Sequence, residues 1–448
     1  MRLVSLALDS VDSLYWGCTT HFSTLLLNML KDRVELADFP LLVRLNPGVP
    51  WKTRGNGAVV LRLLYDGDVK SLLEAVRGYA LEYSNKEDFG IAVVEGAPWE
   101  VERLRILYSK ALTDVVTVDV ARKAVEKSGG LWAGGMGVIG ASAALAALAP
   151  WDDYTFELIA YRKPENWGVE RCMNYKLLVE AEARMPPCTF NNIDYHGRTA
   201  AAAPGGWDPV LAGFRGDCIA PLAGYAIGLC EEVDLWALFR SNQHTDAHAK
   251  PLTGELKPYQ TGLVDVTVKN SKVIAGGHVI VRGLALGGDV DIVFYRETGP
   301  LNSAARMLSE GDEITVLGTV KPYKPRGVTV IAAEKMRVNK VETKTVKINP
   351  RCPKCGTRME SPGRKGGLRC PKCGYKKETT KINVRIERSL TTGEYTPPPG
   401  RLKHLTSPKG RKQQPPLKLP LKLKIDQVLS TDPKRIPHTS EAHSSWNP

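Results

Sequence analysis

The sequence predicts an α+β protein built from several domains, and three observations carry that prediction. Its 448 residues exceed what a single hydrophobic core usually fills, since most domains run from about 100 to 200 residues. Helical and strand-like patterns alternate through the first half, and a β-rich stretch follows at 261–341. Two CxxC pairs come after that stretch. We therefore expect α/β units first, then a β-barrel, a small cysteine module and a tail.

The first unit is expected at residues 1–155. Its opening run, RLVSLAL, is apolar enough to form a buried strand. A stretch rich in Gly, Pro and Asn at 44–58 predicts a loop. The remaining expected elements are helices at 19–30, 69–83 and 100–127 and a strand at 59–65.

A second unit is expected at residues 156–255. It begins with the strand-like run FELIAYR, continues through a helical pattern at 172–184 and then becomes rich in turn-forming residues. The uncharged segment before it, 131–150, has the length of a membrane span. Because Ala and Gly dominate that segment and gain little from transfer into lipid, we expect a glycine-rich turn and a buried helix, with no membrane partner.

The stretch from 256 to 345 predicts an OB-fold barrel. Five short β-rich runs are separated by Gly, Asp and Pro, and a helical insert at 302–308 precedes the fourth. OB-folds bind nucleic acids through a charged groove and aromatic platforms, for which Tyr295 and Tyr323 are candidates, but they also bind oligosaccharides and proteins. The barrel is therefore a candidate nucleic-acid reader.

Four cysteines predict a structural zinc ribbon at 346–380. Cys352, Cys355, Cys370 and Cys373 form two CxxC pairs, each within the sequence CPKCG. Two thiolate pairs on tight turns complete a tetrahedral Zn²⁺ site and leave no open coordination position. The other five cysteines stand isolated, which favours a reducing compartment over a disulfide framework, and the N-terminus lacks the apolar core of a signal peptide. We expect a cytoplasmic protein.

The charge distribution favours a polyanionic partner. Lys plus Arg outnumber Asp plus Glu by 61 to 48, a formal net charge of +13. The excess is concentrated at 381–448, which holds thirteen Lys or Arg against five Asp or Glu. Because the segment from 396 onward is rich in Pro and basic residues and has little to bury, we expect a basic tail that orders only on its partner.

Three polar side chains follow the first strand. Asp9 and Asp12 are placed to hold a Mg²⁺ ion that bridges nucleotide phosphates, although two surface aspartates in a turn are an equally good interpretation of the spacing. Thr19 and its neighbour Thr20 open the next helical stretch, so either is placed as its N-cap. The pattern alone does not separate a catalytic from a structural role.

Two glycine-containing segments are candidates for phosphate binding. In the first, cations and backbone N–H groups stand close together, which suits an anion; its residues are Lys52, Arg54, Gly55, Asn56 and Gly57. In the second, a glycine run leads into a helix, and tight packing explains it as well as anion binding does; its residues include Gly134, Gly135, Gly137 and Gly140.

The second unit carries acidic residues in turn-rich surroundings. They suit a guanidinium group or a polyamine through charge-assisted hydrogen bonds, although ordinary turn formation is the commoner role of such residues. His244 and His248 near one of them indicate a metal cluster only weakly. The candidates are Asp194, Asp208, Asp217 and Asp246.

In their order along the chain, these motifs resemble one family, the archaeal isoleucine-tRNA 2-agmatinylcytidine synthetases. The resemblance covers nearly the whole chain and includes the OB-fold and both CPKCG turns. The other segments that carry it are DSVDSLYWGCTT at 9–20, RLNPGVPWKTRGNGA at 44–58, FELIAYR at 156–162, FNNIDYHGR at 190–198, GWDPVLAGFRGD at 206–217, FRSNQHTDAH at 239–248 and YTPPPGRLKHL at 395–405.

The resemblance implies a kinase-like α/β domain and a ferredoxin-like domain before the OB-fold, the ribbon and a tRNA-binding tail. It also implies a ligase that uses ATP to join agmatine to C2 of the wobble cytidine in the CAU anticodon of isoleucine tRNA, which changes codon reading from AUG to AUA. Because the C2 oxygen is a poor leaving group, ATP must phosphorylate it before the agmatine amine displaces it.

The same resemblance implies roles for individual residues. Asp9 and Asp12 would hold Mg²⁺ and ATP, and Thr19 would become phosphorylated. Phosphate contacts would come from Lys52 and Arg54 and from the glycine-containing segments around Gly55, Asn56, Gly57, Gly135 and Gly137. Agmatine would be bound by Asp194, Asp208 or Asp217. The first motif has Ser10 where the family pattern usually has a second aspartate.

A different class of function remains open from the sequence alone. The barrel and ribbon also suit a non-catalytic protein that binds tRNA or single-stranded nucleic acid. The long N-terminal half favours the enzyme, because a simple binding protein needs neither a carboxylate-bearing strand end nor a basic glycine loop.

Overall fold

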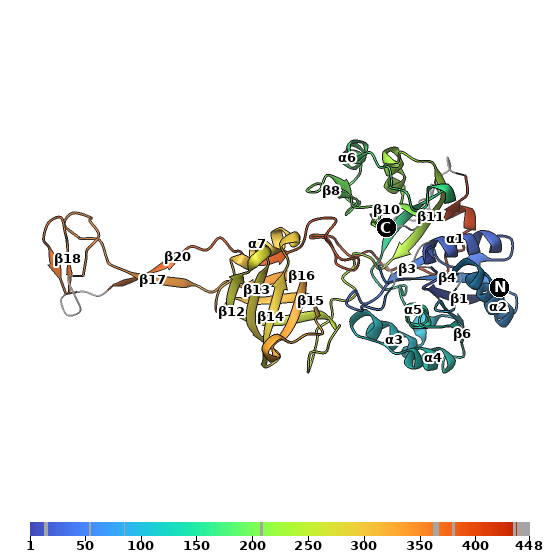
Figure 1. Cartoon of the computed structure of the whole chain (residues 1–448), viewed down its shortest axis with the longest axis horizontal. Helices are drawn as coiled ribbons and strands as arrows, with labels where there is room; N and C mark the ends of the chain where they lie inside the picture. Colours follow the sequence, from blue (N-terminus) through green and yellow to red (C-terminus); the bar gives the residue numbers. More distant parts are fainter. Residues whose placement is uncertain are drawn as a thin grey trace.

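The structure of the protein is a computed structural model that describes residues 1–12, 17–52, 55–84, 86–206, 209–361, 367–378, 381–432 and 436. An α/β body, a β-barrel, a two-stranded stalk and a small cysteine module follow one another along its longest axis (Figure 1). The body and the cysteine module therefore lie at opposite ends of the molecule.

One mixed sheet runs through the body in the strand order β10-β7-β11-β3-β4-β1-β5-β6. The central strand β1 pairs antiparallel with β4 and with β5, so its last residue lies between neighbouring strands and away from the edge strands of the sheet. Two short strands, β2 and β22, pair with β4 and β11. The strands are β1 (Arg2–Asp9), β2 (Glu35–Leu36), β3 (Leu41–Arg44), β4 (Gly57–Tyr65), β5 (Gly90–Glu95), β6 (Leu131–Gly134), β7 (Thr155–Arg162), β10 (Val210–Gly216), β11 (Val233–Ser241) and β22 (Leu429–Ser430).

Among the described residues, six α-helices belong to the body. The single helix expected at 100–127 is two helices, because the Asp114 side chain accepts the N–H of Val115 at 2.8 Å and the backbone there is extended. A small hairpin of β8 (Ile193–Asp194) and β9 (Thr199–Ala200) lies beyond the last helix. The helices are α1 (Thr19–Leu30), α2 (Val69–Ser84), α3 (Glu102–Thr113), α4 (Val118–Glu126), α5 (Val138–Ala144) and α6 (Tyr175–Arg184).

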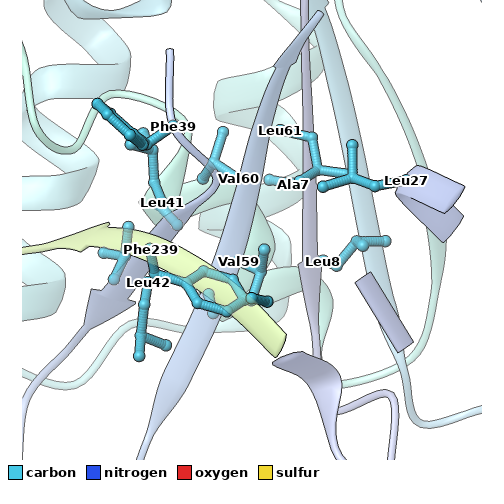
Figure 2. Packing of buried hydrophobic residues seen from close by; sticks show 14 of the residues in the cluster. Ala7, Leu8, Leu27, Phe39, Leu41, Leu42, Val59, Val60, Leu61 and Phe239 are labelled. Atoms are coloured by element: carbon cyan, nitrogen blue, oxygen red, sulfur yellow. The ribbon is translucent and has the colours of Figure 1, made fainter. Parts of the chain in front are cut away.

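The core of the body forms where apolar strand residues meet the helices. Figure 2 shows Ala7 of β1 beside Leu61 of β4, with Leu27 of α1 close to both. All three side chains are at most 2% exposed. Fully burying one leucine contributes about 1.5–3 kcal/mol, so this packing fixes the position of the strand end that carries the candidate site.

The two expected α/β units share one hydrophobic core. Parallel pairing of β11 with β3 places Arg240 opposite Leu41 and joins the units into one sheet. Arg62 and Arg240 both donate to the Asp38 carboxylate, at 2.7 and 2.6 Å, and all three side chains are fully buried. The boundary predicted at residue 155 coincides with the start of β7, but the sheet and the hydrophobic core continue across it.

The barrel has the five strands that the sequence predicts. Antiparallel pairings give the strand order β14-β13-β12-β15-β16, and β14 closes the barrel by pairing parallel with β16. Helix α7 (Pro300–Arg306) precedes the fourth strand, where a helical insert is expected. The strands are β12 (Thr261–Val273), β13 (Val279–Ala285), β14 (Gly288–Phe294), β15 (Glu313–Val320) and β16 (Thr329–Lys340).

A stalk carries the cysteine module away from the barrel (Figure 1). It consists of β17 (Lys344–Ile348) and β20 (Ile382–Ile386), paired antiparallel, and extends past both ends of the expected ribbon. The module contains the short pair β18 (Leu368–Arg369) and β19 (Lys376–Lys377). After the stalk the chain returns to the barrel, where β21 (Gly393–Tyr395) pairs with β16.

The expectation that the basic tail orders only on a partner is wrong for most of it. Residues 400–432, here called the C-terminal strap, run back across the body, where Leu417, Leu423 and Val428 are buried in its core. Leu421 and Leu423 also donate backbone hydrogen bonds to Ala37 and Leu36, both at 2.8 Å. Widely spaced apolar residues within a Pro- and Lys-rich segment are enough to fold it against a preformed surface.

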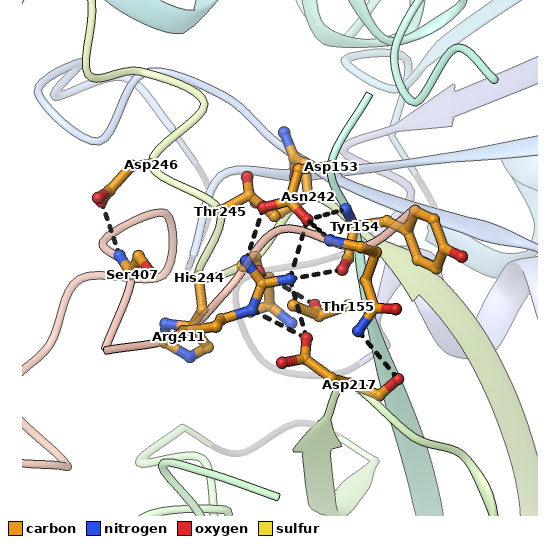
Figure 3. Close-up of polar contacts among 12 residues, drawn as sticks. Asp153, Tyr154, Thr155, Asp217, Asn242, His244, Thr245, Asp246, Ser407 and Arg411 are labelled. Carbon is orange, nitrogen blue, oxygen red and sulfur yellow. Dashed lines mark hydrogen bonds and ion pairs between the residues drawn. The ribbon is translucent and has the colours of Figure 1, made fainter. Parts of the chain in front are cut away.

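Arg411 anchors the strap. Its guanidinium pairs with Asp153 at 2.6 Å and with Asp217 at 2.8 Å, and it donates to the Tyr154 carbonyl at 2.7 Å (Figure 3). The Arg411 side chain is only 4% exposed. This buried cation connects residues that are more than 190 positions apart in the sequence.

In the part of the chain that the structure describes, no helix is both long and apolar enough to cross a membrane. The uncharged segment at 131–150 forms β6, a glycine-rich turn and α5, whose residues are buried apart from Ile139. The predicted turn and buried helix are confirmed.

Replacing Arg411 with Met is expected to lower the free energy of unfolding of the body by about 3–5 kcal/mol, because Asp153 and Asp217 would stay buried without their cation. Urea unfolding followed by tryptophan fluorescence measures the loss. Lys409→Met, an exposed position on the same strap, should change stability by less than about 0.5 kcal/mol. Equal midpoints for the Arg411 variant and the wild type would show that this ion pair does not hold the strap.

Candidate active site

Asp9 ends the central strand β1 inside a crowded turn. Its carboxylate accepts the backbone N–H of Ser10 at 2.7 Å, and its side chain is 8% exposed. A Cβ atom on Gly140 would lie 1.8 Å from that carboxylate, so α5 can approach this closely only with glycine there. Burial raises the pKa of Asp9 to about 7, with a further increase from the charge of Asp12. A cation that binds beside this carboxyl group would favour its ionised form.

Asp12 and Thr19 flank the turn that follows β1. Asp12 is 3% exposed and pairs with Lys86 Nζ at 3.4 Å. Thr19 is the first residue of α1, and its hydroxyl accepts the Val11 N–H at 3.1 Å. The N-cap role expected of one of the two threonines is wrong, because Cys18 holds that position without a side-chain hydrogen bond. The Thr19 hydroxyl is thus turned toward the carboxylate-bearing turn.

Tyr83 of α2 fixes the start of α1. Its hydroxyl accepts the Cys18 N–H at 3.1 Å and lies 2.8 Å from His21 Nδ1. Gly17 has φ +82°, and a Cβ there would meet the Tyr83 ring at 2.9 Å, so the approach requires glycine. Burial lowers the pKa of His21 to about 4, so the ring is neutral at physiological pH.

The basic glycine loop brings Lys52 to the same region. The Lys52 ammonium donates to the Pro47 carbonyl, and its burial, together with the charge of Lys403, lowers its pKa. Asn56, at φ +52°, donates from Nδ2 to the Asn46 carbonyl at 2.9 Å and so shapes the loop. Arg54 lies outside the described residues, Gly55 is the first described residue after it, and Gly57 begins β4.

Lys52 lines three cavities, and two of them also contain an aspartate that the sequence singles out. The smaller, of about 130 Å³, also has Asp9, Ser10 and Asn56 in its wall. The larger of these two, of about 650 Å³ and here called the larger cavity, has Asp12, Thr19, Gly55 and Gly57 in its wall and opens toward the second unit. The strand-end carboxylates, the Thr19 hydroxyl and the basic loop, which the sequence singled out separately, are thus brought together.

The opposite wall of the larger cavity consists of residues that the sequence reasoning missed. Arg215 of β10 donates to Glu157 of β7 at 3.1 Å, and Glu157 is 3% exposed. Arg44 Nε donates to Gln243 Oε1 at 3.1 Å; His404 of the strap lies 3.1 Å from the same oxygen, and the Arg44 charge lowers its pKa. The available signal was a charged residue inside an apolar strand, as in FELIAYR and VLAGFRG, because such residues are seldom buried without a partner.

The second glycine segment serves packing. The backbone N–H of Gly135 donates to Phe89 at 2.8 Å, and that of Gly137 donates to Asp88 at 2.9 Å. A Cβ on Gly137 would lie 2.3 Å from the Gly90 nitrogen. Both N–H groups are therefore used inside the protein, which favours the packing interpretation of these glycines, and their phosphate-binding role stays a prediction.

A third cavity, of about 710 Å³, lies between the loop at 47–52 and the barrel. Its wall contains Tyr259, Tyr295 and Tyr323 of the barrel region and Arg401 and Lys403 from the strap side. Tyrosine rings beside basic side chains are the combination that stacks bases and contacts phosphates. The two tyrosines expected as stacking platforms share one cavity, and their role stays a prediction.

The candidate agmatine-binding aspartates have different environments. Asp194 accepts the N–H groups of His196 and Gly197 at 3.0 and 3.1 Å, as a turn-forming aspartate does. Asp217 pairs with Arg411, and burial raises its pKa. Asp208 lies outside the described residues, but residues 201–206 and 210 on either side of it line the larger cavity.

The weak metal cluster expected around Asp246 is wrong. Asp246 pairs with Lys335 at 2.8 Å and accepts the Ser407 N–H at 2.7 Å (Figure 3). His244 Nδ1 lies 2.9 Å from the Thr406 carbonyl, and burial lowers the pKa of His244 to about 3. His248 lies 3.2 Å from Glu334. These side chains hold the strap and the barrel against the body.

The four ribbon cysteines form a closed ligand set. Their sulfur atoms all lie within 4.8 Å of one another, and the closest pairs are 3.4 and 3.6 Å apart. A tetrahedral site with Zn–S bonds of about 2.3 Å needs separations of about 3.8 Å, so the set fits Zn²⁺. The predicted cluster is confirmed.

The interpretation of the remaining cysteines as isolated is wrong for two of them. Cys188 and Cys218 form a disulfide with a Cα–Cα distance of 5.9 Å. It joins the segment that leads into Asn191 and Asn192 to the end of β10, where Asn192 accepts the Arg215 N–H at 2.8 Å. The crosslink therefore supports one wall of the larger cavity.

Models of three domains of one protein family match parts of this chain. The model of the TiaS TCKD domain matches residues 5–68, that of the TiaS FLD domain matches 135–248, and that of the TiaS C-terminal zinc ribbon domain matches 349–390. The isoleucine-tRNA 2-agmatinylcytidine synthetase TiaS of Acidilobus saccharovorans is 47% identical over 435 residues, which are 96% of this chain and 99% of that protein.

Two solved structures have the same fold. The crystal structure of TiaS in complex with its isoleucine tRNA and ATP is 31% identical with a TM-score of 0.80, over 94% of this chain and 100% of that one. The crystal structure of TiaS in complex with the same tRNA, AMPCPP and agmatine is 28% identical with a TM-score of 0.76, over the same shares. An α/β body with a charged cavity, joined to a barrel and a zinc ribbon, is the architecture of a multidomain synthetase. This chain belongs to the isoleucine-tRNA 2-agmatinylcytidine synthetase family, TiaS.

The raised pKa of Asp9 predicts a pH dependence of stability. The folded state prefers the neutral acid, so the stability contribution of this group is fully present below its unfolded pKa near 3.8 and is lost as the pH rises toward its folded pKa of about 7. Relative to Asp9→Asn, the wild type without nucleotide should lose about 1.4 kcal/mol per pH unit between pH 5 and 7 and then level off. Urea unfolding at each pH tests this, and parallel pH profiles would contradict it.

Replacing Cys370 with Ser is expected to abolish zinc binding, from one zinc ion per chain to none, because the closed set loses a ligand. Metal analysis of the purified protein measures the content. Cys18→Ser is the matched control and should retain the full metal content, since Cys18 lies in the body. Full zinc content in the Cys370 variant would remove this thiol from the site.

Proposed function

We propose that this protein uses ATP to attach agmatine to C2 of the wobble cytidine in the CAU anticodon of isoleucine tRNA. The observation that carries the proposal is that Asp12, Thr19 and Lys52 line one cavity in a chain 47% identical to a named synthetase over nearly its whole length. The solved relatives hold an isoleucine tRNA with ATP, or with AMPCPP and agmatine, on the same fold. By resemblance to the family, we assign the first unit as a kinase-like domain and the second unit as a ferredoxin-like domain.

The chemistry assigned to the body is phosphoryl transfer followed by substitution. ATP phosphorylates the C2 oxygen; the agmatine amine then attacks C2, the C–N bond forms, the C–O bond breaks and phosphate leaves. Lys52 and Lys86 carry positive charge next to the site of transfer. The Thr19 hydroxyl, which accepts the Val11 N–H beside Asp12, is assigned as the threonine that becomes phosphorylated in this family.

Asp9 and Asp12 are assigned as the ligands of a Mg²⁺ ion. Two neighbouring carboxylates are suitable oxygen ligands for Mg²⁺. Burial raises the pKa of Asp9, and a bound cation would favour the ionised form of this carboxyl group. Bound there, the ion would neutralise charge on the nucleotide phosphates. Ser10, which stands where the family pattern usually has aspartate, adopts φ +56° and leaves these two as the carboxylates of the turn.

Agmatine is a cation, and we assign its guanidinium to Asp208. Asp194 forms a turn and Asp217 is already paired with Arg411, whereas the residues on both sides of Asp208 line the larger cavity. An aspartate receives a guanidinium through charge-assisted hydrogen bonds, and the position of Asp208 in the sequence, between segments that line the cavity, suits that role.

The non-catalytic alternative is not favoured. A protein that only binds RNA has no use for a buried acid in the wall of a cavity of about 130 Å³, and the family models match the body as well as the ribbon.

Incubating the purified protein with ATP, Mg²⁺, radiolabelled agmatine and a CAU-anticodon isoleucine tRNA transcript tests the function. Label should enter the RNA only when ATP is present, and a transcript with uridine at the wobble position should stay unlabelled. No incorporation by a protein that binds the tRNA would leave the binding alternative.

Thr19→Val should reduce this incorporation by at least about 100-fold, because the hydroxyl assigned to phosphoryl transfer is removed, and leave the Kd for tRNA unchanged. Thr20→Val is the matched comparison, since Thr20 lines the same cavity one residue further along. Equal losses in both variants would assign the effect to the helix start instead of the Thr19 hydroxyl.

Asp208→Asn should raise the KM for agmatine by about 10-fold or more, since a charge-assisted hydrogen bond is worth roughly 1.5–3 kcal/mol. Asp194→Asn, the turn-forming control, should leave that KM within about twofold. A larger effect at Asp194 than at Asp208 would reverse the assignment.

A further inference from the structure

Four cysteines of the second unit form two facing pairs that the proposed chemistry does not use. Cys188 and Cys218 are joined as a disulfide. Cys172 and Cys230 bracket that pair in the sequence, and both of these side chains are exposed. Cys172 and Cys230 are therefore free thiols, whereas the pair between them in the sequence is crosslinked.

Cys172 and Cys230 lie directly opposite each other on two antiparallel segments. Met173 and Leu229 form an isolated antiparallel bridge, flanked by backbone hydrogen bonds from Cys230 to Cys172 at 3.3 Å and from Asn174 to Gly228 at 2.8 Å. Opposite residues at such a position have Cα atoms about 5.5 Å apart, within the range that a disulfide spans. Interaction with the Cys172 side chain also raises the pKa of the Cys230 thiol, so the two side chains lie close to each other.

We propose that Cys172 and Cys230 form a second disulfide. Its two cysteines lie on either side of the Cys188–Cys218 pair in the sequence, so the second unit would contain two nested crosslinks. The backbone already holds the two segments in the register that places Cys172 opposite Cys230. Both thiols are open to solvent, so an external oxidant can reach them.

The oxidant is a small-molecule or protein disulfide. One thiolate attacks the oxidant, a mixed disulfide forms and one oxidant thiolate leaves. The second cysteine thiolate then attacks the mixed disulfide, the Cys172–Cys230 bond forms and the second oxidant thiolate leaves. Two thiols lose two protons and two electrons, and the oxidant disulfide is reduced to two thiols.

The crosslink would fix the segment that packs against the helix carrying Thr19. Arg162 donates to Glu231 at 2.8 Å and to the Val169 carbonyl at 2.7 Å, so this segment already follows β7 closely. Trp167 within it packs edge-on against the His21 ring of α1 at 5.5 Å. A covalent bond at Cys172 limits how far the segment can open away from α1.

Peptide mapping of the full-length protein tests the pairing. After equilibration with excess oxidised glutathione, acid quenching and alkylation of free thiols, the peptides that contain Cys172 and Cys230 should be recovered crosslinked to each other. Recovery of both cysteines alkylated, or each carrying its own glutathione, would overturn the proposal. Cys230→Ser supplies the reference, in which Cys172 carries a single glutathione.

Thermal unfolding tests the staple. In the oxidised state, Cys230→Ser should melt about 5 °C below the wild type, because the crosslink restricts the unfolded chain. With a phosphine reductant the two proteins should melt together, and Cys18→Ser should follow the wild type in both conditions. A confirmed crosslink with identical oxidised melting temperatures would overturn its stabilising role.

Discussion

Asp38 lies between two arginines at the place where the body would otherwise divide. Arg62 comes from β4 and Arg240 from β11, and each donates to the Asp38 carboxylate with no exposure to solvent. One carboxylate does not neutralise two guanidinium groups, and carbonyls accept some of the remaining N–H groups: Ala147 and Leu148 accept from Arg62, and Leu148 also accepts from Arg240. A buried cluster of this kind costs desolvation and contributes specificity of geometry, because only one arrangement of the strands satisfies it. It fixes β11 beside β3 and therefore the second unit beside the first.

That constraint explains why the candidate site can be assembled from distant segments. Asp12 and Thr19 come from the first strand turn, Glu157 and Arg215 from the second unit, and His404 from the strap. Each segment reaches the cavity because the sheet is continuous and because Arg411 ties the strap to both units. Substrates that enter between the units would contact residues whose relative positions depend on the same buried charges.

Much of this was accessible from the sequence, for local reasons. The strand before Asp9 and the five barrel strands follow from hydrophobic periodicity, and the cysteine cluster follows from spacing, because neighbours in the sequence decide each of them. The strap was missed because its composition is that of a disordered tail, and its burial depends on a surface formed more than 190 residues earlier. Asp217 resembled a ligand-binding aspartate for the same reason: its partner, Arg411, is remote in sequence.

The length of the molecule bears on the size of its substrate. The cysteine module lies at the opposite end from the body, beyond the barrel and the stalk (Figure 1). A nucleotide and agmatine need only the cavities of the body, so the distant parts have a use only if one ligand is long enough to span them. The stalk and module carry exposed basic side chains suited to a phosphate backbone: Lys344, Lys347, Lys354, Lys372, Lys376, Lys377 and Arg385. Shape and charge together thus favour an elongated polyanion held at one end while the other end enters the body, which is how a tRNA would present its anticodon to the chemistry.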